Sequence, residues 1–134
     1  MTLNIKNNIS ELTSLAPFVE QLAEAYDIAP DMTFKINLAL DEAMANVVSY
    51  AYPEGIEGEI SLTADKEDGI LVLQITDEGS PFDPTKGGDV DITLSAENRP
   101  VGGLGIFLIK QMMDTVDYQR IGKKNVLTME VKVV

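Results

Sequence analysis

Residues 35–52 read KINLALDEAMANVVSYAY, and the rest of the chain is organised around this stretch. Pro30 and Asp31 precede it and Pro53 follows it, at positions where a helix can begin and must end. Between these prolines nearly every turn carries apolar side chains on more than one side, which is typical of a helix buried deep within a domain. The sequence therefore predicts a central, buried helix.

Two polar side chains stand out on this apolar helix. Glu42 and Asn46 are four residues apart, so they project from the same face, one turn above the other. A carboxylate and a carboxamide are costly to bury without polar partners. The pair therefore faces a ligand, forms a solvated polar edge or caps a neighbouring loop, and the helix alone does not separate these alternatives.

The composition is that of one globular domain. The chain has 134 residues, of which 45% are hydrophobic and 24% are charged, and a domain of this size buries roughly two thirds of its surface. No apolar run approaches the ~20 residues of a membrane span, and residues 1–6 lack the layout of a signal peptide. We expect a single domain over residues 1–134, located in the cytoplasm, with no membrane partner.

Charge and residue types exclude several kinds of chemistry. Cysteine and histidine are both absent, which excludes disulfides, thiol catalysis and metal sites built from either residue. The formal net charge of -12 argues against nucleic-acid binding, which requires a basic surface. A polyphosphate site on so acidic a chain needs a divalent cation and positive backbone dipoles; solubility is the default meaning of the charge.

Helices and strands are predicted in runs rather than in alternation. Alternating apolar residues indicate strands at 3–6 and 59–64, and a mostly apolar run indicates a central strand at 70–77. Two last strands are predicted at 115–120 and 125–133, and helices at 11–26, capped by Ser10, and at 106–113. Asp68-Gly69 predicts a hairpin turn. This order favours an α+β fold: a two-layer α/β sandwich with a mixed, mainly antiparallel sheet and helices on one face.

Two glycine-containing motifs follow the central helix. Asp77-Glu78-Gly79 ends a strand in a carboxylate, which can accept a hydrogen bond from an exocyclic amine such as that of adenine; the alternative is an ordinary turn. Gly102-Gly103-Leu104-Gly105 leads into a helix, and its N–H groups can cradle phosphate; the alternative is a hinge. Residues 78–100 show no periodicity, which is typical of a lid or binding loop. Neither a P-loop nor a dinucleotide fingerprint is present.

Together and in this order, the three motifs resemble the ATP-binding region of the GHKL (Bergerat-fold) superfamily. Glu42-x-x-x-Asn46 is similar to its N-box, Asp77-x-Gly79 to its first glycine box, and Gly103-Leu104-Gly105 to its second. The resemblance covers essentially the whole chain. Residues 77–83 (DEGSPFD) and 102–109 (GGLGIFLI) look most like the anti-sigma-factor serine/threonine kinases.

The resemblance implies a role for each motif. ATP lies between the helices and a lid at about residues 79–102. Asn46 binds Mg²⁺, Asp77 accepts a hydrogen bond from the adenine amine, and Gly79 lies against the base. Gly103, Leu104 and Gly105 wrap the phosphates.

Three further assignments follow from the same resemblance. Thr128 helps to hold adenine through water, Arg99 reaches the terminal phosphate from the lid, and Glu42 is the base that acts on the nucleophile. Two positions depart from the pattern: Tyr50 stands where the kinase group often has a basic residue, and Arg99 is farther from Gly103 than the pattern suggests.

The implied function is that of a bacterial, ATP-dependent serine/threonine kinase. Such a protein acts as an anti-sigma factor, sequesters a sigma factor, phosphorylates a STAS-type anti-anti-sigma partner and forms a homodimer. Three alternatives stay open: a nucleotide-sensing module without kinase turnover, a detached histidine-kinase catalytic domain, and a scaffold that binds no nucleotide.

Overall fold

The computed structural model describes residues 1–53, 55–81, 83 and 103–133, and it contains a five-stranded sheet in the order β1-β2-β3-β5-β4. Every pair of neighbouring strands is antiparallel, so the mixed sheet that the sequence suggested has no parallel pair within the described residues. The strands are β1 (Thr2–Lys6), β2 (Glu59–Glu67), β3 (Ile70–Asp77), β4 (Thr115–Ile121) and β5 (Lys124–Lys132).

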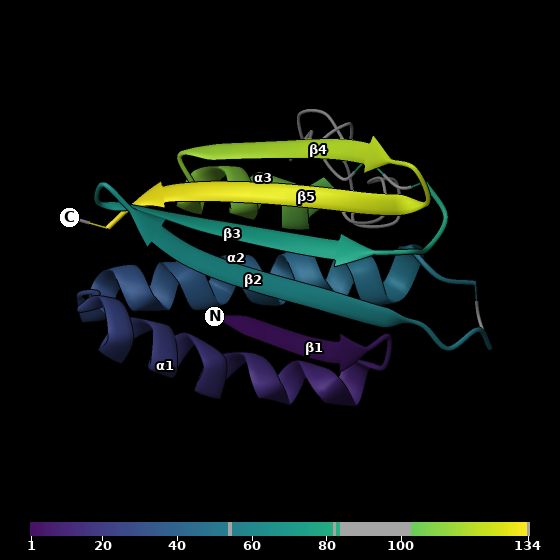
Figure 1. Cartoon of the computed structure of the whole chain (residues 1–134), viewed down its shortest axis with the longest axis horizontal. Coiled ribbons are helices and arrows are strands. Elements are labelled where there is room, and N and C mark those ends of the chain that lie inside the picture. Colours follow the sequence, from purple (N-terminus) through teal and green to yellow (C-terminus); the bar gives the residue numbers. More distant parts are fainter. Residues whose placement is uncertain (54, 82, 84–102, 134) are drawn as a thin grey trace.

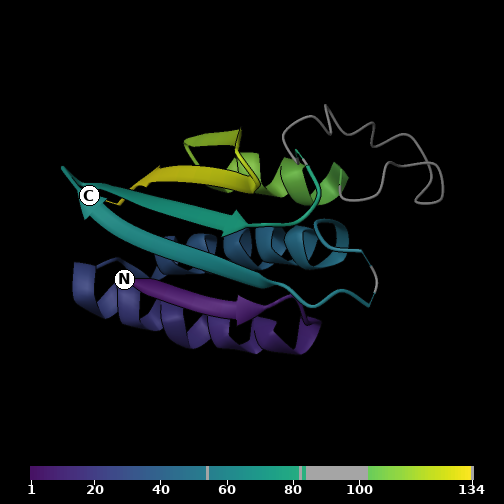
Figure 2. The ribbon, with the colours of Figure 1, turned by 45° about the vertical axis from the view of Figure 1, so that its right-hand side comes forward.

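All three described α-helices cover the same face of this sheet (Figures 1 and 2). They are α1 (Leu15–Tyr26), α2 (Pro30–Tyr50) and α3 (Gly103–Met112), and α2 packs against both of the others. The predicted α+β architecture, with helices on one face, is confirmed. None of the helices in the described part of the chain is both long and apolar enough to cross a bilayer.

The hydrophobic core fills the space between the sheet and α2. Leu71, Leu73 and Ile75 of β3 are buried on the helix side, whereas Gln74 and Thr76 occupy alternate positions, face the opposite side and are half-buried. Successive residues of a strand point to opposite faces of its sheet, so the parity of a position decides whether it can reach the helices. Asp77 continues the helix-facing series at the end of β3.

The hairpin turn at Asp68-Gly69 lies where the sequence predicts it, and a second hairpin turn joins β4 to β5. Asp68 and Gly69 have φ angles of 52° and 78°, the left-handed values that a two-residue turn between twisted strands requires. Gly122, with a φ of 60°, turns the chain from β4 into β5. These turns fix the register of the two hairpins.

The first helix begins differently from the prediction. Asn8, and not Ser10, provides the cap: its side-chain oxygen accepts a hydrogen bond from the Ser10 N–H at 3.0 Å. The cap opens a 3-10 helix, η1 (Ile9–Ser14), which precedes α1. Pro17 accounts for the change, because it has no N–H to donate and is tolerated only in the first turn of an α-helix.

Candidate functional site

Four segments meet at one end of the sheet: the C-terminal ends of α2 and β3, and the first residues of β5 and α3 (Figure 1). Asp77 of β3 pairs with Asn125 of β5 in the ladder. At the opposite end the chain leaves α3 for β4, and the Asp114 N–H donates to the Glu130 carbonyl oxygen at 2.8 Å. The sequence motifs predicted to form a site are therefore carried by elements that share this end.

On α2, the polar pair lies on a largely buried helix. Asn46 is 7% exposed, and its side-chain Nδ2 has no hydrogen-bond partner within the described residues. Glu42, one turn earlier, is half-buried. Burial raises the pKa of the neighbouring Asp41 carboxyl, and the negative charge of Glu42 adds to this effect. A buried amide without a partner costs about 1–3 kcal/mol, so this position is suited to receive a polar ligand.

Asp77 is a buried carboxylate at the end of β3. It is 4% exposed, and its Oδ1 accepts hydrogen bonds from the Gly79 N–H at 2.8 Å and from Asn125 Nδ2 at 2.9 Å. Burial raises the pKa of Asp77, although these bonds and the nearby Arg120 charge oppose the increase. Both bonds fall on Oδ1, so Oδ2 is the oxygen that can accept from a ligand.

The partner of Asp77 on the neighbouring strand is a residue that the sequence motifs did not reveal. Asn125 is 4% exposed, and its Nδ2 donates to both Asp77 Oδ1 and the Ser80 carbonyl oxygen. Its Oδ1 accepts from the Tyr118 hydroxyl and, at 3.1 Å, from Arg120 Nη1. Only the register between β3 and β5 could have indicated this residue, because it places position 125 opposite position 77.

Gly79 packs directly against the end of α2. A Cβ atom added at this position would lie 2.2 Å from the Ala51 carbonyl oxygen, far inside van der Waals contact. The same carbonyl accepts a hydrogen bond from the Ser80 N–H at 2.6 Å. The glycine of the Asp77-x-Gly79 motif is therefore required for packing, independently of any contact with a base.

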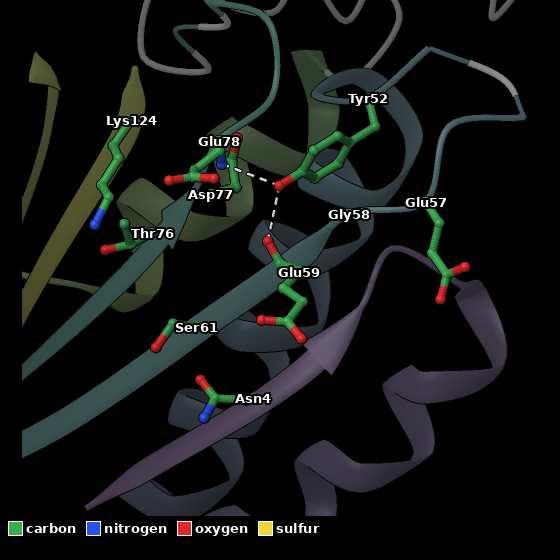
Figure 3. A pocket seen from close by; sticks show the side chains of 10 residues that line it. All are labelled: Asn4, Tyr52, Glu57, Gly58, Glu59, Ser61, Thr76, Asp77, Glu78 and Lys124. Atoms are coloured by element: carbon green, nitrogen blue, oxygen red, sulfur yellow. Dashed lines mark hydrogen bonds between the residues drawn. The ribbon is translucent and has the colours of Figure 1, made fainter. Parts of the chain in front are cut away.

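Tyr52 joins the three segments around this turn. Its hydroxyl accepts a hydrogen bond from the Glu78 N–H at 3.0 Å and donates to the Glu59 carbonyl oxygen at 2.8 Å (Figure 3). Its ring also lies where a Cβ on Gly58 would be, 2.2 Å from the nearest ring atom. The segment after α2 is thus attached to the start of β2 and to the end of β3.

A hollow of about 490 Å³ lies beside the same turn (Figure 3). Its lining includes Asn4, Ser61 and Thr76, which occupy the sheet face that the helices do not cover. Glu57, Glu59 and Glu78 also line it, and among the described lining residues Lys124 is the only cation. An acidic wall of this kind repels polyphosphate, so the helix side of Asp77 is the better candidate for a nucleotide site.

The structure brings together some of the residues predicted from sequence and separates others. Gly103, Leu104 and Gly105 form the first turn of α3, which begins three residues before the predicted start, and α3 packs against the helix that carries Glu42 and Asn46. The first turn of a helix has unpaired N–H groups, as a phosphate cradle requires.

Thr128 lies apart from these residues. It is on the outer face of β5, where its hydroxyl accepts from Gln74 Nε2 at 3.2 Å, and Asn125 holds the place beside Asp77. The reason is parity: position 128 is an odd number of residues from position 125 and points to the other face. Arg99 and most of the predicted lid lie outside the described residues.

Within the described residues, no group of three or more acidic side chains is placed to hold a metal ion. The atom of Asn46 that lacks a partner among the described residues, Nδ2, is an N–H donor and does not bind a metal ion. Asn46 can offer a metal a single ligand atom, its amide oxygen. This fits Mg²⁺, which takes few protein ligands and keeps waters or phosphate oxygens.

Comparison with known proteins identifies the class. Residues 5–131 match the model of the family described as "Histidine kinase-like ATPase domain", and the chain belongs to that family. This confirms the resemblance to the GHKL superfamily.

Particular relatives are named kinases. The chain is 29% identical over 128 residues to the serine/threonine-protein kinase BtrW of Bordetella bronchiseptica, covering 96% of this chain and 90% of BtrW. It is 33% identical over 107 residues to the serine-protein kinase RsbW of Bacillus cereus, covering 77% of this chain and 64% of RsbW.

Solved structures support the fold. The histidine kinase domain of the blue-light activated kinase EL346 from Erythrobacter litoralis superposes with a TM-score of 0.59 at 13% identity, covering 89% of this chain and 61% of that one. The histidine kinase AdeS from Acinetobacter baumannii superposes with a TM-score of 0.51 at 13% identity, covering 99% of this chain and 68% of AdeS.

Proposed function

We propose that this chain is a single-domain, ATP-dependent serine/threonine protein kinase acting as an anti-sigma factor. The observation that carries the proposal is the buried Asn46, whose Nδ2 has no hydrogen-bond partner within the described residues, on the helix that ends beside the Asp77 turn and packs against α3. Binding of Mg·ATP requires an acceptor for adenine, a ligand for the metal ion and donors for the phosphates in one place. The family match and the two named serine kinases support the same reading.

ATP is proposed to extend from the turn after β3 to the start of α3. Asp77 Oδ2 accepts a hydrogen bond from the exocyclic amine of adenine, and Gly79 lies against the base. Gly103, Leu104 and Gly105 surround the phosphates through the backbone N–H groups of the first helical turn. Arg99 remains a proposed contact with the terminal phosphate. Asn125 is added as the proposed partner of Asp77, and the water-mediated contact of Thr128 with adenine stays a proposal that its place on the outer face of β5 does not favour.

Mg²⁺, held by the Asn46 amide oxygen, supplies charge neutralisation for the phosphates. This matters in a chain with a formal net charge of -12, which by itself repels a triphosphate. The atom of Asn46 without a partner within the described residues is Nδ2, an N–H donor, and an acceptor such as a phosphate oxygen of the bound nucleotide would satisfy it, not the metal ion.

Glu42 is the proposed general base. Its carboxylate takes the proton of a serine hydroxyl on the partner protein while that oxygen bonds to the γ-phosphorus, and the bond from this phosphorus to the bridging oxygen breaks to release ADP. Phosphoryl transfer requires mainly positioning and charge stabilisation, together with a carboxylate near the attacking hydroxyl. The half-buried position of Glu42, one turn from Asn46, supports this role.

The partners follow from the resemblance to anti-sigma-factor kinases. The acceptor serine is proposed to lie on a STAS-type anti-anti-sigma protein, and the sequestered partner is a sigma factor. A homodimer and a cytoplasmic location belong to the same proposal. The chain spans less than two thirds of the length of RsbW, so the activity of that whole protein is not transferred without a test.

Two measurements test the proposal. Isothermal titration with Mg·ATP should give saturable binding, and a chain that binds no nucleotide would be a scaffold. Incubation with Mg·[γ-³²P]ATP and a STAS-type protein should yield acid-stable phosphoserine; acid-labile phosphate would favour a detached histidine-kinase domain.

Substitution of Glu42 separates the kinase from a nucleotide-sensing module. Glu42→Gln should lower the rate of phosphate transfer about 10²-fold or more, because it removes a base, while Mg·ATP affinity changes little. Binding without transfer by the wild type would favour the sensing module, a candidate that Tyr50 supports by standing where the kinase group often has a basic residue. Equal transfer rates for wild type and variant would remove Glu42 from the mechanism.

A further inference from the structure

The side chain of Asn125 has both of its polar atoms engaged. Its Nδ2 donates to Asp77 Oδ1 at 2.9 Å and to the Ser80 carbonyl oxygen at 2.8 Å. Its Oδ1 accepts from the Tyr118 hydroxyl and from Arg120 Nη1. Turning this amide over would place donors against donors and acceptors against acceptors, so its orientation is fixed by its surroundings.

A fixed amide at this position also fixes the Asp77 carboxylate. Oδ1 receives one N–H from Asn125 and one from Gly79, which together hold the plane of the carboxylate. Both Asp77 and Asn125 are 4% exposed, so bulk water has little access to replace these bonds. Oδ2 is left pointing in one direction as the acceptor for a ligand.

Arg120 extends this arrangement to the turn after β3. Its Nη1 donates to the Gly79 carbonyl oxygen at 2.8 Å as well as to Asn125 Oδ1 at 3.1 Å. One guanidinium nitrogen thus holds both the turn and the amide that contacts the carboxylate. Tyr118 and Arg120 occupy alternate positions on β4 and share the helix-facing side with Asn125.

We propose that Asn125, held by Tyr118 and Arg120, is a positioning residue that aims Asp77 Oδ2 at the exocyclic amine of the bound base and thereby sets selectivity for 6-aminopurines. The inference rests on the proposed function, since it concerns the same nucleotide site. It adds that selectivity depends on a β4–β5 hairpin whose three side chains need not touch the nucleotide. Without Asn125, Asp77 Oδ1 keeps only the hydrogen bond from the Gly79 N–H, so the plane of the carboxylate is no longer held and its contact with the amine is weakened.

The test compares two nucleotides that differ in one group. Mg·ATP and the magnesium complex of purine riboside triphosphate, which carries hydrogen in place of the 6-amine, are titrated into each protein by calorimetry. The wild type should bind ATP at least about tenfold more tightly, the value of one hydrogen bond to a charged acceptor. Asn125→Leu should lose most of this preference by weakening ATP binding alone.

A second test variant and a control variant complete the experiment. Tyr118→Phe removes only the hydroxyl that fixes Asn125 Oδ1, and it should reduce the preference about two- to threefold even if Asn125→Leu fails to fold. Gln119→Leu is the matched control, because Gln119 lies between Tyr118 and Arg120 on the exposed outer face of β4, and both affinities should be unchanged.

The outcomes distinguish this inference from the function on which it rests. Equal weakening of both nucleotides in Asn125→Leu and Tyr118→Phe would indicate a merely structural role and overturn the inference. An undiminished preference in both variants would overturn it as well. If the wild type binds neither nucleotide, the proposed function fails and the inference fails with it; if it binds both equally, the contact between Asp77 and the amine is refuted.

Discussion

The buried, charged carboxylate of Asp77 lowers the stability of the folded protein, and the same group is proposed to bind adenine. Burial raises its pKa above that of the unfolded chain, so the folded protein binds this proton more readily than the unfolded chain does. Stability therefore falls as the pH rises from the ordinary aspartate value through the raised one, and the cost is fully present at neutral pH.

Asp77→Asn should be at least as stable as the wild type at pH 7, because it removes a buried charge and keeps the acceptor for Gly79 and Asn125. The advantage of the variant should shrink as the pH is lowered through the raised pKa. Its Mg·ATP affinity should fall more than about tenfold, because an amide donor then faces the amine.

Urea unfolding at pH 7 and pH 4 measures the change in stability of Asp77→Asn, and calorimetry measures the change in Mg·ATP affinity. Unchanged binding would refute the proposed contact with adenine.

The structural role of Tyr52 can be tested by removing one atom, its hydroxyl oxygen. Tyr52→Phe removes the hydroxyl that bonds the Glu78 N–H and the Glu59 carbonyl oxygen, and it should cost about 1–2 kcal/mol in the free energy of unfolding. Tyr26→Phe is the matched control, because its hydroxyl makes one long bond of 3.5 Å to Ala64, and the loss should stay below about 0.5 kcal/mol. Similar losses in both variants would contradict the role of Tyr52 at this turn.

At the scale of the elements, α2 carries two buried amides that differ in position. Asn46 Nδ2 and Asn37 Oδ1 both lack a hydrogen-bond partner within the described residues. Asn46 is on the face that also carries Glu42, whereas Asn37 lies about 180° around the helix from it. Each is an unfavourable buried group unless a ligand satisfies it.

Asn46→Leu should therefore leave the stability of the free protein unchanged or raise it by about 1 kcal/mol, and abolish magnesium-dependent ATP binding. Asn37→Leu should have a similar effect on stability and leave ATP binding intact. Thermal unfolding and calorimetry provide both readouts. Retained ATP affinity in Asn46→Leu, or its loss in Asn37→Leu, would contradict the assignment of the ligand to the Asn46 face.

The sequence predicted the elements better than their ends. The bounds of α2 follow from Pro30 and Pro53, which fix a start and a stop by covalent structure. The start of the first helix was misplaced because Pro17 is tolerated only in the first turn of α1, and Asn8 caps the 3-10 helix that precedes it. The all-antiparallel sheet was not predictable from strand patterns alone, because they do not specify which strands pair.

The same limit applies to the site. Glu42, Asn46 and Asp77 are recognisable because each is a polar residue within or beside an apolar run. Asn125 is not recognisable in this way, because its contact with Asp77 joins positions 48 residues apart through the pairing of β3 with β5. The placement of Thr128 on the outer face likewise depends on strand parity, which a motif comparison does not contain.

For the molecule as a whole, the formal net charge of -12 governs the approach of ATP. The Mg·ATP complex carries less negative charge than free ATP, and Asn46 is the proposed protein ligand of its magnesium ion. With EDTA the free nucleotide should bind at least about tenfold more weakly. The remaining affinity should rise with salt between about 50 and 300 mM, because screening reduces a long-range repulsion. Titration at several salt concentrations checks this; an affinity without magnesium that falls steeply with salt would indicate a local cationic site instead.

The contact between Gly79 and Ala51 also restricts how this chain can change over time. A side chain at position 79 would strike the carbonyl oxygen of position 51, and that carbonyl is held in place by the Ser80 N–H. Ala51 is itself only 1% exposed, and its Cβ atom would lie 2.9 Å from a Cβ added at position 79, so side chains at the two positions would compete for the same space. Mutations at the two sites should therefore be epistatic, and lineages that retain the turn are expected to keep both positions small.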